Sequence, residues 1–171
     1  LRTAGFNTAD LGAMNDSSKA IMTLMMLIGG SPGSTAGGMK TTTIAVLILN
    51  AFATFGREAE TEVFGRRFDN TVVKNAATIA ILYFFLFFTG GIAISQIEHV
   101  ALSDCLFETA SAVGTAGLTL GITTELGLVS HLILVVLMYL GRVGGLTLIY
   151  AAISVKIQSG AKRPLDKITV G

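Results

Sequence analysis

The stretch that decides the fold is residues 71–97, which read TVVKNAATIAILYFFLFFTGGIAISQI. Its one charged residue, Lys74, lies near an end, and a block of aromatic residues occupies the middle. A helix needs about 20 mostly apolar residues to cross the hydrocarbon core of a membrane. We therefore predict a membrane-spanning helix here and an all-α integral membrane protein around it.

The composition of the 171-residue chain agrees with this class, since 51% of residues are hydrophobic and 13% are charged, against about 25% charged in soluble domains. The net charge of +1 leaves no basic excess for a nucleic acid, so none is expected as a partner. A single cysteine, Cys105, and two histidines do not make an intrachain disulfide or a Cys/His zinc site. Because no leader-like start is present, we expect a fragment that begins inside a longer protein.

Two further apolar stretches carry glycine-rich interruptions: residues 126–157 around 141–145, and residues 17–55 at 29–38. A break that faced lipid would leave backbone groups unpaired, so broken spans must line protein or water. We therefore predict a pore or a substrate pathway. Close packing of small residues is an alternative explanation for Gly141 and Gly145.

Basic residues indicate the orientation. Two polar segments, 56–74 and 156–171, hold eight of the 12 lysines and arginines, and the positive-inside rule places both in the cytoplasm. Lys40 and Arg142 fall instead within the broken spans, where a charge is expensive and indicates function. For both residues, snorkelling of the side chain to the interface is the alternative.

A repeated motif supports the prediction of a pore or a substrate pathway. Thr3-Ala4-Gly5 recurs 112 residues later as Thr115-Ala116-Gly117. In the second copy, the span 71–97 is followed by a half-helix at 101–112, a glycine loop at 113–119 and a return span at 126–157. That order is typical of a re-entrant pore unit, in which glycine lets backbone carbonyls face an axis and bind a monovalent cation. A helix C-cap followed by a turn is the alternative for each Thr-Ala-Gly, and Glu108 is either an interfacial acid or a support for the loop.

The chain resembles the C-terminal half of the Trk/Ktr/HKT superfamily of potassium transporters, and most closely the membrane subunit of a bacterial Ktr-type system. Four motifs carry the resemblance: RTAGFNT (2–8), IGGSPGSTAGGMKTTT (28–43), SAVGTAGLTLGIT (111–123) and MYLGRVGGLT (138–147). The family has four span, pore-loop, span units around one pore, a potassium-channel-like fold with broken second spans.

The resemblance assigns the parts of the chain to these units. Residues 1–56 would be the third unit from its filter (2–8) onward, with a broken span at 17–55 and an intramembrane loop at 29–38. Residues 57–70 would be a cytoplasmic loop, residues 71–157 the fourth unit with its filter at 113–119, and residues 158–171 a cytoplasmic tail.

The resemblance also implies site residues. The selectivity filter would include Thr3, Ala4, Gly5, Phe6, Thr115, Ala116, Gly117 and Leu118, which bind K⁺ through carbonyls alone. The gate would comprise Gly29, Gly30, Ser31, Gly33, Gly37, Gly38, Lys40 and Arg142. Glycine at the two filter positions fits potassium selectivity, while the absent units leave sodium permeability and sodium coupling open.

The function implied is that of a pore-forming potassium uptake subunit of a bacterial cytoplasmic membrane, without enzymatic activity or a bound cofactor. It would form a homodimer in the lipid membrane and bind a cytoplasmic nucleotide-binding regulatory subunit. Three other functions are weighed: a broken-helix secondary transporter with alternating access, a purely structural membrane anchor, and a phosphate-loop enzyme. Met39 between Gly38 and Lys40 disagrees with the phosphate-loop pattern.

Overall fold

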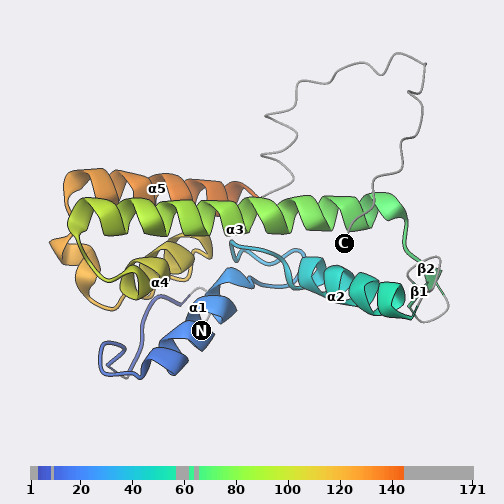
Figure 1. The fold of residues 1–171 in the computed structure, drawn as a ribbon, viewed down its shortest axis with the longest axis horizontal. Coiled ribbons are helices and arrows are strands. Elements are labelled where there is room, and N and C mark those ends of the chain that lie inside the picture. The colour runs from blue at the N-terminus through green and yellow to red at the C-terminus, as the bar shows by residue number, and fades with distance from the viewer. Residues whose placement is uncertain (1–3, 9, 57–61, 64–65, 145–171) are drawn as a thin grey trace, which may run out of the picture.

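The computed structural model describes residues 4–8, 10–56, 62–63 and 66–144 (Figure 1). Its helices are α1 (Asp16–Leu27), α2 (Thr41–Phe55), α3 (Asn70–Glu98), α4 (Leu102–Val113) and α5 (Leu128–Val143), with a 3₁₀ turn at Ile122–Glu125. Two short strands, β1 (Glu62–Val63) and β2 (Arg66–Arg67), pair antiparallel between α2 and α3. The all-α class is thus confirmed, apart from this small ladder. The expected tail (158–171), the end of the last span (145–157) and part of the loop at 57–70 lie outside the described residues.

Helix α3 is the long axis of the fold. Its 29 residues have a mean hydropathy of 2.1 in the most apolar window, and at 1.5 Å per residue they extend about 43 Å, more than the ~30 Å hydrocarbon core. Asp69 begins the helix by accepting hydrogen bonds from the amide and hydroxyl of Thr71. The Thr71 hydroxyl bond is the main reason that the pKa of Asp69 lies below its ordinary value. Among the described residues, α3 is the helix that is long and apolar enough to span a membrane.

Helices α2, α4 and α5 pack against α3, and α1 packs against α4. Helix α5 lies beside one half of α3, and α2 lies along the other half, while α4 is enclosed by α1, α3 and α5 (Figure 1). With 12 residues, α4 is about 18 Å long and too short to cross the membrane. Eight of its residues are nevertheless buried, so α4 is the centre of the packing.

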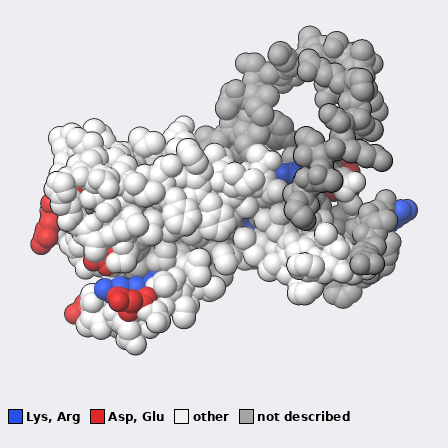
Figure 2. Space-filling view, viewed as in Figure 1, with Lys and Arg blue, Asp and Glu red and all other residues white. Residues whose placement is uncertain are grey.

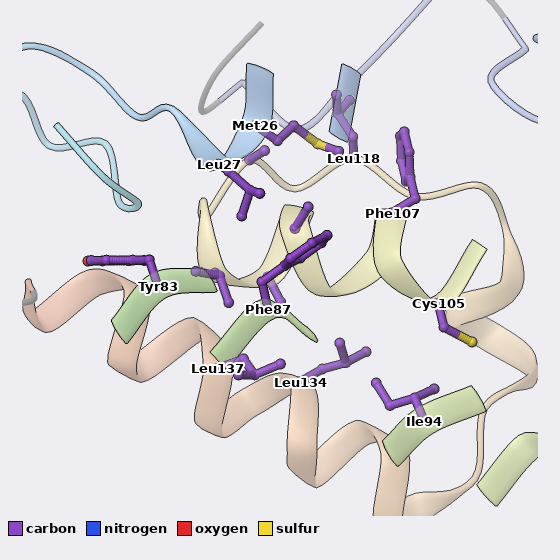
Figure 3. Packing of buried hydrophobic residues seen from close by; sticks show 14 of the residues in the cluster. Met26, Leu27, Tyr83, Phe87, Ile94, Cys105, Phe107, Leu118, Leu134 and Leu137 are labelled. Atoms are coloured by element: carbon purple, nitrogen blue, oxygen red, sulfur yellow. The ribbon is translucent and has the colours of Figure 1, made fainter. Parts of the chain in front are cut away.

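The core forms where these four helices meet. Figure 3 shows Met26 and Leu27 of α1, Tyr83, Phe87 and Ile94 of α3, Cys105 and Phe107 of α4, and Leu134 and Leu137 of α5 in one cluster. Apolar side chains also cover the outside: Ile81 and Phe85 of α3 and Tyr139 of α5 are each more than 60% exposed. In Figure 2 most of the visible Lys, Arg, Asp and Glu atoms lie toward the margins of the face, and most of the area between them is uncharged. An apolar exterior of this kind suits contact with lipid.

Candidate functional site

Two glycine loops from distant parts of the sequence meet at Gly5 and Gly117. Both glycines have a left-handed backbone, with φ of 70° and 78°. A Cβ built on Gly117 would lie 2.9 Å from the Cα of Gly5, and one built on Gly5 would lie 3.5 Å from the Gly117 carbonyl oxygen. Glycine is therefore required at Gly117 for two reasons, the positive φ and the space.

The structure describes seven of the eight residues predicted to line a filter, and Thr3 lies outside the described residues. Around the two glycines, Ala116 and Leu118 are buried, whereas Phe6 is 79% exposed. Thr115 also has a positive φ, 49°, which is uncommon for a residue other than glycine. The second loop thus has an unusual backbone at two of its four central positions, Thr115 and Gly117.

Helix α4 leads directly into the second glycine loop. Its last turn closes with hydrogen bonds from the Gly114 amide to the Ala110 carbonyl (2.8 Å) and from the Ala116 amide to the Ser111 carbonyl (2.9 Å). The C-terminal end of a helix carries the negative end of its dipole. The geometry therefore directs partial negative charge toward the loop at 115–118, as a cation would require.

The interruption between α1 and α2, residues 28–40, is called the break segment below. It folds back on itself, because Ile28 and Met39 form a parallel β-bridge. The Gly29 amide donates to the Met39 carbonyl (2.6 Å), the Met39 amide to the Leu27 carbonyl (3.1 Å) and the Thr41 amide to the Gly30 carbonyl (3.1 Å). The two helix ends beside the interruption thus satisfy each other's backbone groups, which makes such a break tolerable within a membrane.

The break segment touches the second glycine loop and α5. The Gly37 amide donates to the Thr115 hydroxyl at 2.9 Å, and the Gly38 amide donates to the Gly141 carbonyl at 3.3 Å. A Cβ on Gly37 would lie 2.6 Å from that hydroxyl, so this glycine permits the approach. The structure therefore brings the predicted gate residues against Thr115, one of the predicted filter residues.

The two cations that the sequence predicts within broken spans, Lys40 and Arg142, both bond carbonyls of the break segment. Lys40 Nζ donates to the carbonyls of Ser34 (3.1 Å) and Ala36 (2.7 Å), and an Arg142 guanidinium nitrogen donates to the carbonyl of Thr35. The three consecutive carbonyls of residues 34–36 thus accept hydrogen bonds from two positive charges, one within the break segment and one on α5. Of the other predicted gate residues, the Ser31 carbonyl accepts from the Ser34 amide at 3.0 Å. Gly33, with φ of 83°, has open space around it.

Gly141 differs from its expected place in a break, because α5 continues through it to Val143. A Cβ on Gly141 would overlap the Val113 carbonyl at the end of α4. This glycine therefore serves close packing, which is the alternative that the sequence left open. Its carbonyl also accepts a hydrogen bond of 3.3 Å from the Tyr83 hydroxyl.

One contributor, Tyr83, was not predicted from the sequence, and for a second, Glu108, the sequence left open whether it is an interfacial acid or a support for the loop. Tyr83 is 2% exposed and is joined to α5 through the Gly141 carbonyl. A tyrosine in an otherwise apolar run is the available signal, since a buried phenol usually finds a partner. Glu108 is 4% exposed and binds the residues that follow the second glycine loop. Within the described residues, no group of three or more His, Cys, Asp or Glu side chains is placed to hold a metal ion.

An apolar helical fold with a helix long enough to span, an interrupted apolar stretch and a packed glycine loop is that expected of an integral membrane protein of the transport class. Residues 1–161 match the family described as TrkH, cation transport protein. The chain belongs to this family, and the resemblance to the Trk/Ktr/HKT superfamily is confirmed.

Its relatives include the Ktr system potassium uptake protein B of Bacillus subtilis, 34% identical over 170 residues that cover 99% of this chain and 38% of the relative. The potassium/sodium uptake protein NtpJ of Enterococcus hirae is also 34% identical, over 99% of this chain and 39% of its own length. The Ktr system potassium uptake protein B of Vibrio alginolyticus is 39% identical over 87% of this chain and 33% of the relative. The chain thus spans less than two fifths of the length of these relatives.

Proposed function

We propose that the chain forms part of the ion pathway of a bacterial potassium uptake system. The observation that carries this proposal is the approach of Gly5 and Gly117, which places two copies of one motif face to face with left-handed glycines. Backbone carbonyls presented by such loops replace the hydration shell of a cation and select it by spacing and field. The relatives' names support K⁺ as the ion.

The break segment is the gate of this pathway. Its amide contact with Thr115, a proposed filter residue, supports this role. Arg142 binds the segment from α5 through the Thr35 carbonyl, and Lys40 bonds the Ser34 and Ala36 carbonyls within the segment. A fixed positive charge beside a cation pathway raises the barrier to passage. Opening therefore requires the loop carbonyls to leave both cations, and flux rises when that contact is weakened.

The architecture proposed is the third unit of a four-unit pore from its filter onward, and the whole fourth unit. The third unit contributes the filter residues Thr3, Ala4, Gly5 and Phe6, and the fourth unit contributes residues 115–118. Like the resemblance, the proposal includes a homodimer in the cytoplasmic membrane, a cytoplasmic C-terminus and a nucleotide-binding regulatory subunit in the cytoplasm. The proposed function includes no enzymatic step and no bound cofactor, and K⁺ is the transported ion.

Complementation tests the proposal. The complete native gene product should restore growth of a potassium-uptake-deficient bacterium at low K⁺, and Gly117→Ser should reduce the ratio of K⁺ to Na⁺ uptake. Na⁺ uptake is measured in parallel, because one relative is named a potassium/sodium uptake protein. Gly144→Ser is the matched control, since Gly144 also has a positive φ, 88°, with open space around it, and lies outside both glycine loops and the turn that follows the second one. If Gly117→Ser left uptake and selectivity like those of the control, the filter assignment would be wrong.

A further inference from the structure

We infer that Glu108 is a positioning residue that sets ion selectivity by holding the segment that leaves the second glycine loop. This inference rests on the proposed function and adds a residue that touches no ion. The segment concerned, residues 119–123, is called the post-loop turn. Its contacts with Glu108 join it to α4, the same helix that leads into the loop.

Glu108 uses both of its carboxylate oxygens on the post-loop turn. Oε1 accepts hydrogen bonds from the Thr119 hydroxyl at 2.6 Å and the Leu120 amide at 2.9 Å. Oε2 accepts from the Thr123 hydroxyl at 2.8 Å. Because the side chain is only 4% exposed, these bonds are shielded from water and are worth more than surface contacts.

The post-loop turn is in turn organised around the two threonine hydroxyls. The Thr119 and Thr123 hydroxyl oxygens lie 2.7 Å apart, and the Gly121 amide donates to the Thr119 hydroxyl at 2.9 Å. Glu108 is therefore the centre of a closed set of contacts. Within the described part of the chain, the donors to its carboxylate are uncharged, and the ion pair found there joins Lys19 to Asp104 instead. An acid that only marked the membrane interface would not need this arrangement.

The position of Glu108 on α4 connects it to the filter. Residues 115–118 leave α4 at its C-terminal end, where the Ala116 amide binds the Ser111 carbonyl, and they return to the same helix where Thr119 and Leu120 bind Glu108. Ser111 and Glu108 are three residues apart, about one helical turn. The glycine loop is thus tied to α4 at both ends, and the spacing of its carbonyls depends on both ties.

Thr119→Val tests this inference, because valine keeps the shape of threonine and removes the hydroxyl that donates to Glu108. Loss of a hydrogen bond to a charged group shifts an equilibrium by about tenfold or more, so the K⁺ to Na⁺ uptake ratio should fall by about tenfold. Thr119→Ser keeps the hydroxyl and should retain the wild-type ratio. Thr124→Val is the control, since the Thr124 hydroxyl bonds the Gly121 carbonyl and not Glu108.

A double variant adds a test of coupling. If Thr119 acts through Glu108, the combination of Glu108→Ala and Thr119→Val should lose no more selectivity than Glu108→Ala alone. Additive losses would contradict a shared tie. A wild-type ratio in Thr119→Val, or an equal loss in Thr124→Val, would overturn the inference.

Hydrogen exchange of the purified complete protein separates this inference from the proposed function. The Leu120 amide should exchange faster in Glu108→Ala and Thr119→Val than in the wild type and in Thr124→Val. If the wild type fails to take up K⁺, the proposed function is refuted. Hydrogen exchange alone then tests whether Glu108 holds the post-loop turn. Faster exchange of the Leu120 amide supports the contact between Glu108 and the post-loop turn, and unchanged exchange in both variants contradicts it.

Discussion

The Gly37 amide donates a hydrogen bond of 2.9 Å to the hydroxyl of Thr115, across 78 residues of sequence. This bond connects the break segment to the glycine loop that follows α4. Thr115 itself has a φ of 49°, which is unfavourable for a β-branched residue. The fold therefore maintains a strained residue at a point where the proposed gate donates a hydrogen bond to the proposed filter.

Removal of this hydroxyl should loosen the gate. Thr115→Val preserves the side-chain shape but leaves the Gly37 amide without its partner in the closed arrangement. Because a hydrogen bond contributes about 0.5–1.5 kcal/mol net, the closed state should lose about two- to tenfold in population. The initial rate of K⁺ uptake into cells, measured with a rubidium tracer, should rise accordingly. Thr115→Ser keeps the donor's partner and should stay near the wild-type rate; an equal rise in both variants would contradict the role of the bond.

The charges that hold the break segment should act unequally. Lys40 Nζ binds two carbonyls, whereas Arg142 binds the one carbonyl of Thr35. We therefore expect Lys40→Met to raise K⁺ flux more than Arg142→Met, and both to exceed the wild type. Lys74→Met is the control, because Lys74 is an exposed lysine at the start of α3. A fall in flux for both folded variants would show that the two charges assist conduction instead of opposing it.

Substitution of Gly141 should reduce the stability of the folded protein. A Cβ there would overlap the Val113 carbonyl, and backbone at the end of α4 has little room to shift. Overpacking of this kind costs about 1–3 kcal/mol, so Gly141→Ala should lower the midpoint of thermal unfolding in detergent by several degrees. Gly90→Ala is the comparison, since its Cβ would meet the flexible end of Leu137 at 2.7 Å. Equal shifts in the two variants would mean that the Val113 contact is not rigid.

The sequence predicted some of these features well and could not predict others. A long apolar run determines a spanning helix locally, and α3 covers the residues expected to span. Whether a glycine interrupts a helix or packs inside it depends on the surface opposite, so nothing near Gly141 indicated that α5 continues past it. The bond from Gly37 to Thr115 and the ties of Glu108 are tertiary contacts. They are consistent with the repeated motif, but no local period specifies which hydroxyl meets which amide.

The exposed tip of the break segment offers the most direct test of gating. Residues 31–35 are exposed, and the Ser34 amide closes a turn onto the Ser31 carbonyl at 3.0 Å. Deletion of residues 32–34 removes this tip and the Ser34 carbonyl that binds Lys40, but it leaves the bridge between Ile28 and Met39. The shortened segment fills less of the pathway and loses one bond to Lys40, so K⁺ uptake should increase.

Pro32→Gly is the matched control, because it alters the composition of the tip but keeps the length of the segment and the Ser34 carbonyl for Lys40. Uptake by this variant should stay close to the wild-type rate, and thermal unfolding in detergent checks that both proteins are folded. A folded deletion variant with unchanged or reduced uptake would mean that the tip does not obstruct the pathway. The contacts of Lys40 and Arg142 would then serve only to satisfy the carbonyls of the interrupted helix, as any break within a membrane requires.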